Sequence, residues 1–493
     1  VSCEPDKTFY VATGAVMGNN TVCPSTEASY DLIDAVLTEI AEIFPFEYIH
    51  IGGDECNKKQ WAAHEQCTHF KEEHGLADDH ELQSYFIKRV EKIVNSKGRK
   101  LIGWDEILEG GLAPNATVMS WRGTAGGVKS AKLGHDVIMS PVKSNYLDLK
   151  QGQALSEPNL GYIQTLLSDA YNFVIAHEDL TPEEHKFILG TQANLWTETN
   201  SDLSKVKYMT FPRLLAVAEN AWTPDSQKSW DGFIERLKSY MELMDFDGVR
   251  HAKSVFNPWV HHSADGKEVK FWFTSEITNP EIRFTLDGTD PKATSCLYKM
   301  GDSVTVTKTS TLKAAIFDGE KMLGNVITRH YPIHKAGGAK VIIRSEENPD
   351  GVVDENSELV NLAFGEFLES NNDGRWKMFS EDADIEIIFN EPTDITKVSV
   401  NAVRHTLWRW YAPKQIEIFA TVNGEYTKIG DSGVMEKNIE KGRNMINNTV
   451  ECPANQVSSI RLKISRLETI PMDYVPSVAG KGTLLNIDEI IVY

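Results

Sequence analysis

The sequence predicts an α/β region followed by two all-β regions. Between residues 27 and 246, short β-branched runs alternate with amphipathic helical stretches, which is typical of βα units around a parallel sheet. From Phe256-Asn257-Pro258 onward, this pattern gives way to alternating strands. A chain of 493 residues is too long for one hydrophobic core. We therefore expect three domains, over residues 1–250, 251–336 and 337–493.

The first region is expected to contain five strands with helices between them. The strand candidates are residues 48–51, 100–103, 117–120, 136–139 and 187–190. Helical spacing of apolar residues predicts a helix over residues 29–44, after a cap at Ser25 or Thr26. A second helix is expected over residues 82–94, and Gly98 is its stop signal.

Polar and aromatic residues cluster directly after each predicted strand. The clusters are Gly52-Gly53-Asp54-Glu55, Trp104-Asp105-Glu106, Trp121-Arg122, Tyr146-Leu147-Asp148 and Trp196-Thr197-Glu198. In a (β/α)₈ barrel, the C-terminal strand ends converge on one mouth, so these clusters predict an active site. Five strands do not close an eight-stranded barrel. We therefore interpret the region as the C-terminal portion of a (β/α)₈ TIM barrel and expect three further strands upstream of Val1.

The remainder of the chain predicts two β-sandwich domains. In the first, strands are expected at residues 270–273, 281–285 and 311–315, with a hairpin turn at Leu286-Asp287-Gly288. Lys335-Ala336-Gly337-Gly338 has the composition of a linker. The second domain has strand candidates at residues 385–389, 397–403, 416–421 and 459–464.

Charge and hydropathy exclude two classes of partner. The formal net charge is -21 and no run of lysine and arginine forms a basic patch, so nucleic acid is not an expected partner. No stretch approaches the ~20 consecutive apolar residues of a membrane helix, and residues 1–6 lack the features of a secretion signal. The sequence does not fix the oligomeric state.

Six cysteines are too few for a disulfide scaffold, and they show no CxxC metal spacing. Cys3 and Cys23 flank a loop and could bridge in an oxidising compartment, or could pack as reduced thiols. We therefore expect neither a metal nor a cofactor.

Residues 50–55, His50-Ile51-Gly52-Gly53-Asp54-Glu55, stand where a strand becomes a turn. The glycines let the backbone approach a ligand while the acids project from the strand end. The alternative is an ordinary tight turn with an acid near the next helix. His50 could orient one of the acids, or could be a hydrogen-bonded core histidine.

These motifs together resemble family 20 of the glycoside hydrolases, whose members carry an H-x-G-G-D-E segment at the end of barrel strand four. The other family motifs follow in order as Gly103-Trp104-Asp105-Glu106, Ser120-Trp121, Asn145-Tyr146-Leu147-Asp148 and Asn194-Leu195-Trp196-Thr197-Glu198. The resemblance implies a bacterial-type β-N-acetylhexosaminidase that removes terminal N-acetylglucosamine or N-acetylgalactosamine from a glycan. It also implies a periplasmic or extracellular location.

The resemblance gives the two adjacent acids different roles. Family 20 is an exception to the usual pair of separated carboxylates, because the substrate's own 2-acetamido oxygen attacks the anomeric carbon. The attack gives an oxazolinium intermediate that water opens with retention. Glu55 would protonate the leaving oxygen and later activate the water. Asp54 would hold the acetamido N–H and stabilise the developing positive charge.

The resemblance also assigns substrate-binding roles to the later motifs. The walls of the pocket would be Trp104, Trp121 and Trp196, although each could instead be core packing. Tyr146 would donate its hydroxyl to the acetamido oxygen. Asp148 and Glu198 would bind sugar hydroxyls at the non-reducing end, which makes the enzyme exo-acting.

One family feature has no counterpart in the sequence. Family members bind the sugar with an arginine at the end of barrel strand one, and neither Arg122 nor Arg213 stands in a matching position. Residues 257–334 resemble the small sandwich that follows bacterial hexosaminidase barrels. Residues 339–493 resemble a discoidin-like jelly roll related to carbohydrate-binding modules, in which Trp408 and Trp410 either stack on sugars or pack internally.

Two other functions fit parts of the pattern. An incomplete barrel that only displays the β modules would make the chain a non-catalytic glycan-binding protein. Alternatively, His50, Asp54, Glu55 and Cys56 could be the metal ligands of a hydrolase, although consecutive acids seldom aim at one ion.

Overall fold

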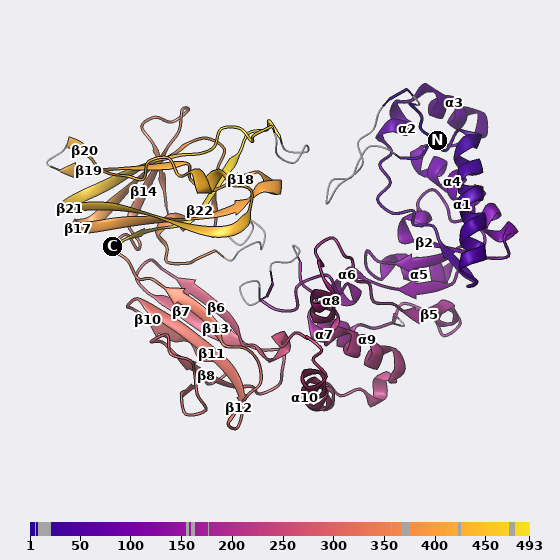
Figure 1. The fold of residues 1–493 in the computed structure, drawn as a ribbon, viewed down its shortest axis with the longest axis horizontal. Helices are drawn as coiled ribbons and strands as arrows, with labels where there is room; N and C mark the ends of the chain where they lie inside the picture. The colour runs from indigo at the N-terminus through magenta and orange to yellow at the C-terminus, as the bar shows by residue number, and fades with distance from the viewer. Residues whose placement is uncertain are drawn as a thin grey trace. The chain divides into compact units, whose positions relative to one another are not determined.

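A computed structural model covers the chain and describes residues 1–4, 6–7, 21–153, 157–158, 163–175, 177–355, 357–365, 375–422, 425–472 and 479–493. The chain divides into two compact units (Figure 1). The first unit comprises residues 1–151 and 164–252, and the second comprises residues 152–163 and 253–493. The units hold different kinds of structure, as the sequence predicts: parallel βα structure in the first and antiparallel sheets in the second.

The first unit is built on one parallel sheet whose five strands lie side by side in sequence order. The strands are β1 (Tyr48–His50), β2 (Lys100–Trp104), β3 (Thr117–Ser120), β4 (Val137–Met139) and β5 (Ile188–Thr191). All five predicted strands are thus confirmed to within about two residues at either end. The sheet is an open segment of the predicted barrel, because a closed barrel of this type has eight strands.

Amphipathic helices cover this sheet. The longest helices of the first unit are α1 (Glu27–Ile43), α4 (Asp79–Ser96) and α10 (Trp230–Phe246), and of these α1 and α4 pack against the sheet. α1 begins two residues before the predicted start at residue 29, and its N-cap is Thr26, one of the two predicted cap residues. Side chains of α1 and α4, including Leu37, Val90 and Val94, pack with Leu101 and Val118 of the sheet. This burial fixes the sheet against the helices.

Shorter helices complete the first unit: α2 (Lys59–Ala63), α3 (Glu65–His74), α5 (Ala125–Lys132), α6 (Val142–Asn145), α7 (Leu167–Asn172), α8 (Leu203–Thr210) and α9 (Arg213–Trp222). Its 3₁₀ turns are η1 (Asp105–Leu108), η3 (Glu184–Phe187) and η4 (Asp225–Gln227). Among the helices of the described residues, none combines the length and the apolar character that a membrane crossing requires.

The second unit begins with two small antiparallel sheets. One contains β6 (Trp259–Ala264), β7 (Val269–Thr274) and β10 (Val304–Val306), and the other contains β8 (Glu281–Thr285), β9 (Cys296–Leu297), β11 (Ser310–Asp318), β12 (Lys321–Met322) and β13 (Ile327–Tyr331). Alternate residues of β7, among them Phe271 and Phe273, enter the core between the sheets. The predicted hairpin turn at residues 286–288 lies in the connection between the antiparallel strands β8 and β9. Those residues open a longer connection to β9, because β8 pairs with β9 from Phe284 to Cys296.

A nine-stranded sheet follows. Its strands are β14 (Lys340–Arg344), β15 (Val352–Asp354), β16 (Lys377–Phe379), β17 (Ala383–His405), β18 (Trp410–Tyr411), β19 (Gln415–Val422), β20 (Glu425–Asp431), β21 (Arg443–Ser465) and β22 (Leu484–Val492). The predicted strands 385–389 and 397–403 are two halves of β17, which pairs with β21 along nearly its whole length (Figure 1). Register shifts between residues 388 and 397 interrupt the alternation there, so the sequence suggested a break.

The predicted linker at residues 335–338 is a packed junction. Ala336 is fully buried, and the Lys335 backbone N–H donates to the Val492 carbonyl. A Cβ built on Gly266 would lie 2.4 Å from the Cα of Gly338, so only glycine fits this backbone crossing. Just before the junction, His334 Nε2 lies 2.8 Å from Oε1 of the fully buried Glu489. Residues 335–338 therefore hold the sheets of this unit together instead of separating them.

The buried Glu489 predicts a pH-dependent stability for the second unit. Burial raises the pKa of Glu489 well above its ordinary value, so its stabilising contribution is lost as pH rises through the folded-state pKa. We expect Glu489→Gln, which cannot ionise, to lose less thermal stability than the parent between about pH 5 and pH 8 in calorimetry. Glu425→Gln, at an exposed position of β20, should follow the parent. Identical profiles for Glu489→Gln and the parent would contradict the prediction.

Candidate functional site

The two predicted acids project from the loop that follows β1. Gly52 and Gly53 have φ angles of 75° and 97°, and a Cβ on Gly53 would lie 2.6 Å from Ile107 Cγ2. Glycine is therefore required at the second position for both conformation and space. The loop is held by its carbonyls, because Gly52 O accepts from Trp104 N at 2.9 Å and Gly53 O accepts from Gln83 Nε2 at 2.8 Å. Both acid side chains remain exposed at this edge.

The electrostatics of the loop separate the two acids. Desolvation raises the pKa of Glu55, and the neighbouring charge of Asp54 raises it further. Glu55 therefore keeps its proton to higher pH than an ordinary glutamate. A raised pKa is what a general acid requires.

His50 shapes the turn from which the acids project. Its Nδ1 accepts a hydrogen bond from Gly52 N at 3.1 Å, and its ring centroid lies 4.8 Å from that of Trp104. The side chain is accessible at its outer face, yet desolvation lowers the pKa of His50 against the opposing effect of Asp54. The neutral imidazole therefore acts as an acceptor within the turn.

Four predicted aromatic residues, each following a different strand, lie in one connected series. The ring centroid of Trp196 lies 6.0 Å from that of Trp104 and 6.1 Å from that of Tyr146. Tyr146 in turn lies 6.3 Å from Trp121, with the two rings nearly parallel. Trp104 and Tyr146 are buried, whereas 41% of Trp196 is exposed. The rings thus form a wall that continues from the sheet to the surface, starting beside His50.

Two buried acids that sequence reasoning left without a role hold Trp121 in place. Trp121 Nε1 donates to Glu106 Oε2 at 2.8 Å. Asp105 Oδ2 accepts from the backbone N–H groups of Trp121 and Arg122, at 3.1 and 3.2 Å, and Asp105 Oδ1 accepts from Arg122 Nε. Both acids belong to η1, directly after Trp104 in β2. They therefore couple the loops that follow two neighbouring strands.

Tyr146 and Asp148 belong to a loop that pairs with the segment after β5. Leu147 N donates to Asn194 O at 2.7 Å, and Asn194 N donates to Asn145 O at 2.8 Å. Desolvation raises the pKa values of Tyr146 and Asp148. Asp148 Oδ1 is buried, and it has no hydrogen-bond partner among the residues that the structure describes.

Glu198 is exposed on the segment after β5, and its charge contributes to the raised pKa of Asp148. The acids Asp148 and Glu198 therefore lie within electrostatic reach of each other. An exposed acid and a buried, unpaired carboxylate oxygen on neighbouring loops are acceptors suited to hydroxyl donors.

Arg213 is the most consequential residue that the sequence reasoning did not place. This fully buried side chain, at the start of α9, donates to four backbone carbonyls: Leu147 O at 2.6 Å, Met209 O at 2.8 Å, Leu149 O at 2.9 Å and Thr165 O at 3.0 Å. It clamps the loop on either side of Asp148. The sequence carried no local signal for it, because an arginine is seldom buried unless its donors are paired and its partners here are distant backbone carbonyls.

Comparison with known proteins identifies the first unit. Residues 1–225 match the model of the glycosyl hydrolase family 20 catalytic domain. This part of the chain belongs to family 20. All the predicted site residues lie within the family 20 domain, and a second match, described as Fn3 associated, covers residues 272–331 of the small sheets.

Three curated relatives carry hexosaminidase names. The chain is 42% identical over 281 residues to the Beta-hexosaminidase of Porphyromonas gingivalis, covering 56% of this chain and 36% of that protein. It is 34% identical over 207 residues to the Beta-hexosaminidase of Vibrio furnissii, covering 41% and 33%. It is 32% identical over 257 residues to the Beta-N-acetylhexosaminidase of Cellulomonas fimi, covering 50% and 47%. The aligned part thus spans between a third and a half of these relatives.

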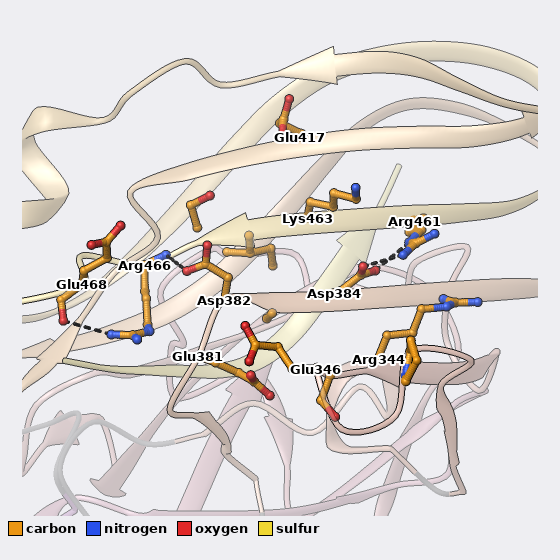
Figure 2. A pocket seen from close by; sticks show the side chains of 15 residues that line it. Arg344, Glu346, Glu381, Asp382, Asp384, Glu417, Arg461, Lys463, Arg466 and Glu468 are labelled. Atoms are coloured by element: carbon orange, nitrogen blue, oxygen red, sulfur yellow. Dashed lines mark hydrogen bonds and ion pairs between the residues drawn. The ribbon is translucent and has the colours of Figure 1, made fainter. Parts of the chain in front are cut away.

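A pocket of about 570 Å³ lies in the C-terminal sheet, apart from the family 20 domain. Its lining includes Arg344, Asp382, Asp384 and Arg461 but no aromatic side chain. Figure 2 shows Arg461 paired with Asp384, and both oxygens of this carboxylate accept from the guanidinium. Stacking on a sugar face requires an exposed ring, so this pocket does not provide the predicted sugar platform.

Trp408 and Trp410, the two tryptophans predicted as possible sugar platforms, differ in exposure. Trp410 is buried, whereas 38% of Trp408 is exposed. The Trp408 ring stacks on His405, with centroids 4.3 Å apart, and its edge meets Trp410 at 4.8 Å. Internal packing therefore accounts for Trp410 and for one face of Trp408.

The Arg213 clamp predicts a large loss of stability on substitution. Arg213→Met would leave four buried carbonyls without their donor, so we expect a loss of at least about 3 kcal/mol. Urea unfolding, followed over the transition of the first unit, measures this loss. Arg250→Met is a matched control because Arg250 is exposed over the Tyr208 ring, and it should cost less than about 1 kcal/mol. Equal losses for the two variants would contradict the clamp.

Proposed function

We propose that the family 20 domain is a retaining exo-β-N-acetylhexosaminidase acting on terminal N-acetylglucosamine or N-acetylgalactosamine. The observation that carries this proposal is the placement of Asp54 and Glu55 as consecutive residues on one strand-end loop. A glycosidase that supplies its own nucleophile holds two carboxylates on opposite sides of the anomeric carbon. Consecutive acids on one loop instead fit the substrate-assisted mechanism by which family 20 departs from this scheme, and in that mechanism the nucleophile comes from the substrate. A 2-acetamido group supplies it.

The proposed reaction has two steps, in which Glu55 acts first as an acid and then as a base, while Asp54 acts on the acetamido group. Glu55, whose pKa is raised, donates its proton to the glycosidic oxygen while the acetamido oxygen attacks the anomeric carbon. Asp54 accepts the acetamido N–H and stabilises the positive charge of the oxazolinium ring. Glu55, now ionised, then takes a proton from water as the water opens the ring. The double displacement retains the configuration.

The surrounding side chains support a pocket that fits an N-acetyl sugar. The wall of Trp104, Trp121 and Trp196 offers apolar faces for the acetyl methyl group and the sugar ring. The Tyr146 hydroxyl is neutral because burial raises its pKa, so it can donate to the acetamido oxygen and aim the nucleophile. The unpaired Oδ1 of Asp148 is an acceptor for a hydroxyl at the non-reducing end of the sugar.

Leaving-group dependence tests the role of Glu55. We expect Glu55→Gln in the full-length protein to lose about 10²–10⁴-fold in kcat/KM on substrates with poor leaving groups. The loss should be much smaller on activated aryl N-acetyl-β-glucosaminides, which depart without acid assistance. Steady-state kinetics with a series of aryl leaving groups measures the difference. An equal loss across the series would remove Glu55 from this role.

The role of the substrate's acetamido group can be tested with the parent protein. An aryl N-acetyl-β-glucosaminide should be hydrolysed, whereas the matching aryl glucoside, which lacks the acetamido group, should not. Equal rates on the two would overturn the proposed mechanism. Binding of the aminosugar without turnover would favour the non-catalytic glycan-binding alternative.

The pH profile tests the coupling of the two acids. Glu55 must be protonated to act as an acid, so kcat/KM should fall as pH rises through its pKa. Asp54→Asn removes the negative charge that helps to raise this pKa. The alkaline limb of the residual activity should therefore move to lower pH. An unchanged limb, or one moved to higher pH, would show that Asp54 does not act on the titrating group.

A further inference from the structure

Three cysteine sulfurs from distant parts of the chain meet in the first unit. Cys3 Sγ lies 3.4 Å from Cys67 Sγ, and Cys23 Sγ lies 3.9 Å from Cys67 Sγ. All three sulfurs lie within 4.8 Å of one another, and all three residues are buried. The sequence suggested a pairing of Cys3 with Cys23, and it gave no reason to include Cys67.

We propose that Cys3, Cys23 and Cys67 bind a structural zinc ion, with His64 as the fourth ligand. Zinc binds thiolate sulfur at ~2.3 Å in a tetrahedron, which places the sulfurs of one ion roughly 3.8 Å apart. The observed separations of 3.4 and 3.9 Å bracket that value. Thiolates select zinc over magnesium or calcium, and iron–sulfur clusters commonly use four cysteines.

His64 is assigned from its spacing and its unpaired nitrogen. It precedes Cys67 by three residues and is the N-cap residue of α3, and Cys67 N donates to His64 O at 3.1 Å. Two ligands separated by two residues are typical of structural zinc sites. His64 Nδ1 is buried, and no partner for it exists within the described residues. The imidazole is not part of the sulfur group in this conformation, so it must turn to complete the site.

The surroundings of the sulfurs fit a structural ion. Trp61 and Leu82, both buried, pack around the sulfurs, and Phe70 and Leu76 extend this cluster. Such an apolar shell excludes water from metal–thiolate bonds. The N-terminal segment also reaches the site through its backbone, because Cys23 N donates to Val1 O at 2.8 Å.

The proposed ion would fasten three segments to the loop that bears the acids. The segments are residues 1–4, residues 21–25 and the start of α3, and Cys56, the residue after Glu55, packs against the same cluster. A metal that closes long loops contributes directly to folding free energy. Its role is therefore to support the far side of the acid-bearing loop, without contact with substrate.

Metal analysis of the full-length protein tests the proposal. After expression with added zinc, purification with a reductant and desalting, elemental analysis should find about one zinc per chain. Removal of the metal by a chelator should lower the temperature at which the first unit unfolds. Zinc should restore it, whereas magnesium and calcium should not.

Variants locate the ion. Cys23→Ala and Cys67→Ala should reduce bound zinc to background, whereas Cys452→Ala, another buried cysteine in the second unit, should keep it. His64→Ala should weaken zinc binding by about tenfold or more. If the cysteine variants do not fold, cobalt substitution of the parent should give sulfur-to-cobalt charge-transfer absorption.

Three results would overturn the proposal. The first is a parent protein that takes up no zinc while all three thiols react with an alkylating reagent. The second is a disulfide between any two of the three cysteines, found by peptide mapping of protein purified without reductant and zinc. The third is bound zinc that survives in Cys67→Ala.

Discussion

The candidate site depends on one constraint: parallel strands end at the same edge of a sheet. Because β1 to β5 run parallel in sequence order, the residues after each strand return to that edge. Segments separated by more than a hundred residues, such as the loop of Asp54 and the loop of Trp196, are thereby brought to the same edge of the sheet. The hydrogen bond from Trp104 N to Gly52 O joins the end of β2 to the loop after β1. The end of β2 therefore helps to position the two acids.

Convergence of the strand ends does not by itself fix the conformations of the loops. Hydrogen bonds made by buried polar side chains also fix them. Asp105 and Glu106 tie the loop after β2 to that after β3, and Arg213 ties the loop after β4 to the helices α8 and α9. Each is expensive to bury unless fully hydrogen-bonded. The hydrogen bonds that offset this desolvation cost also fix the loops. They therefore fix the positions of the aromatic rings that the loops carry.

The sequence predicted features that depend on local periodicity and failed for those that depend on distant partners. The five parallel strands and the residues at their ends follow from alternation and turn chemistry, which a few neighbouring residues define. The Arg213 clamp and the meeting of Cys67 with Cys3 require knowledge of which segments lie together. Residues 335–338 were misread for the same reason, since their composition is that of a linker, whereas the burial of Ala336 and the close approach of Gly338 to Gly266 depend on distant segments.

The carboxylates of the candidate site and those that support its loops differ in their hydrogen bonding. This difference separates groups available for binding from structural groups. Both oxygens of Asp105 accept hydrogen bonds from within the protein, and the side chain is buried, so this carboxylate is not presented to a ligand. Asp148, by contrast, is held by its loop with one buried oxygen that no described residue satisfies. Leaving a buried acceptor unpaired costs about 1–3 kcal/mol, which a sugar hydroxyl would recover on binding.

Glu55 combines a left-handed backbone conformation, at φ 48°, with a carboxyl whose pKa is raised by desolvation. The loop maintains these unfavourable features because the Gly52 and Gly53 carbonyls are anchored to β2 and α4.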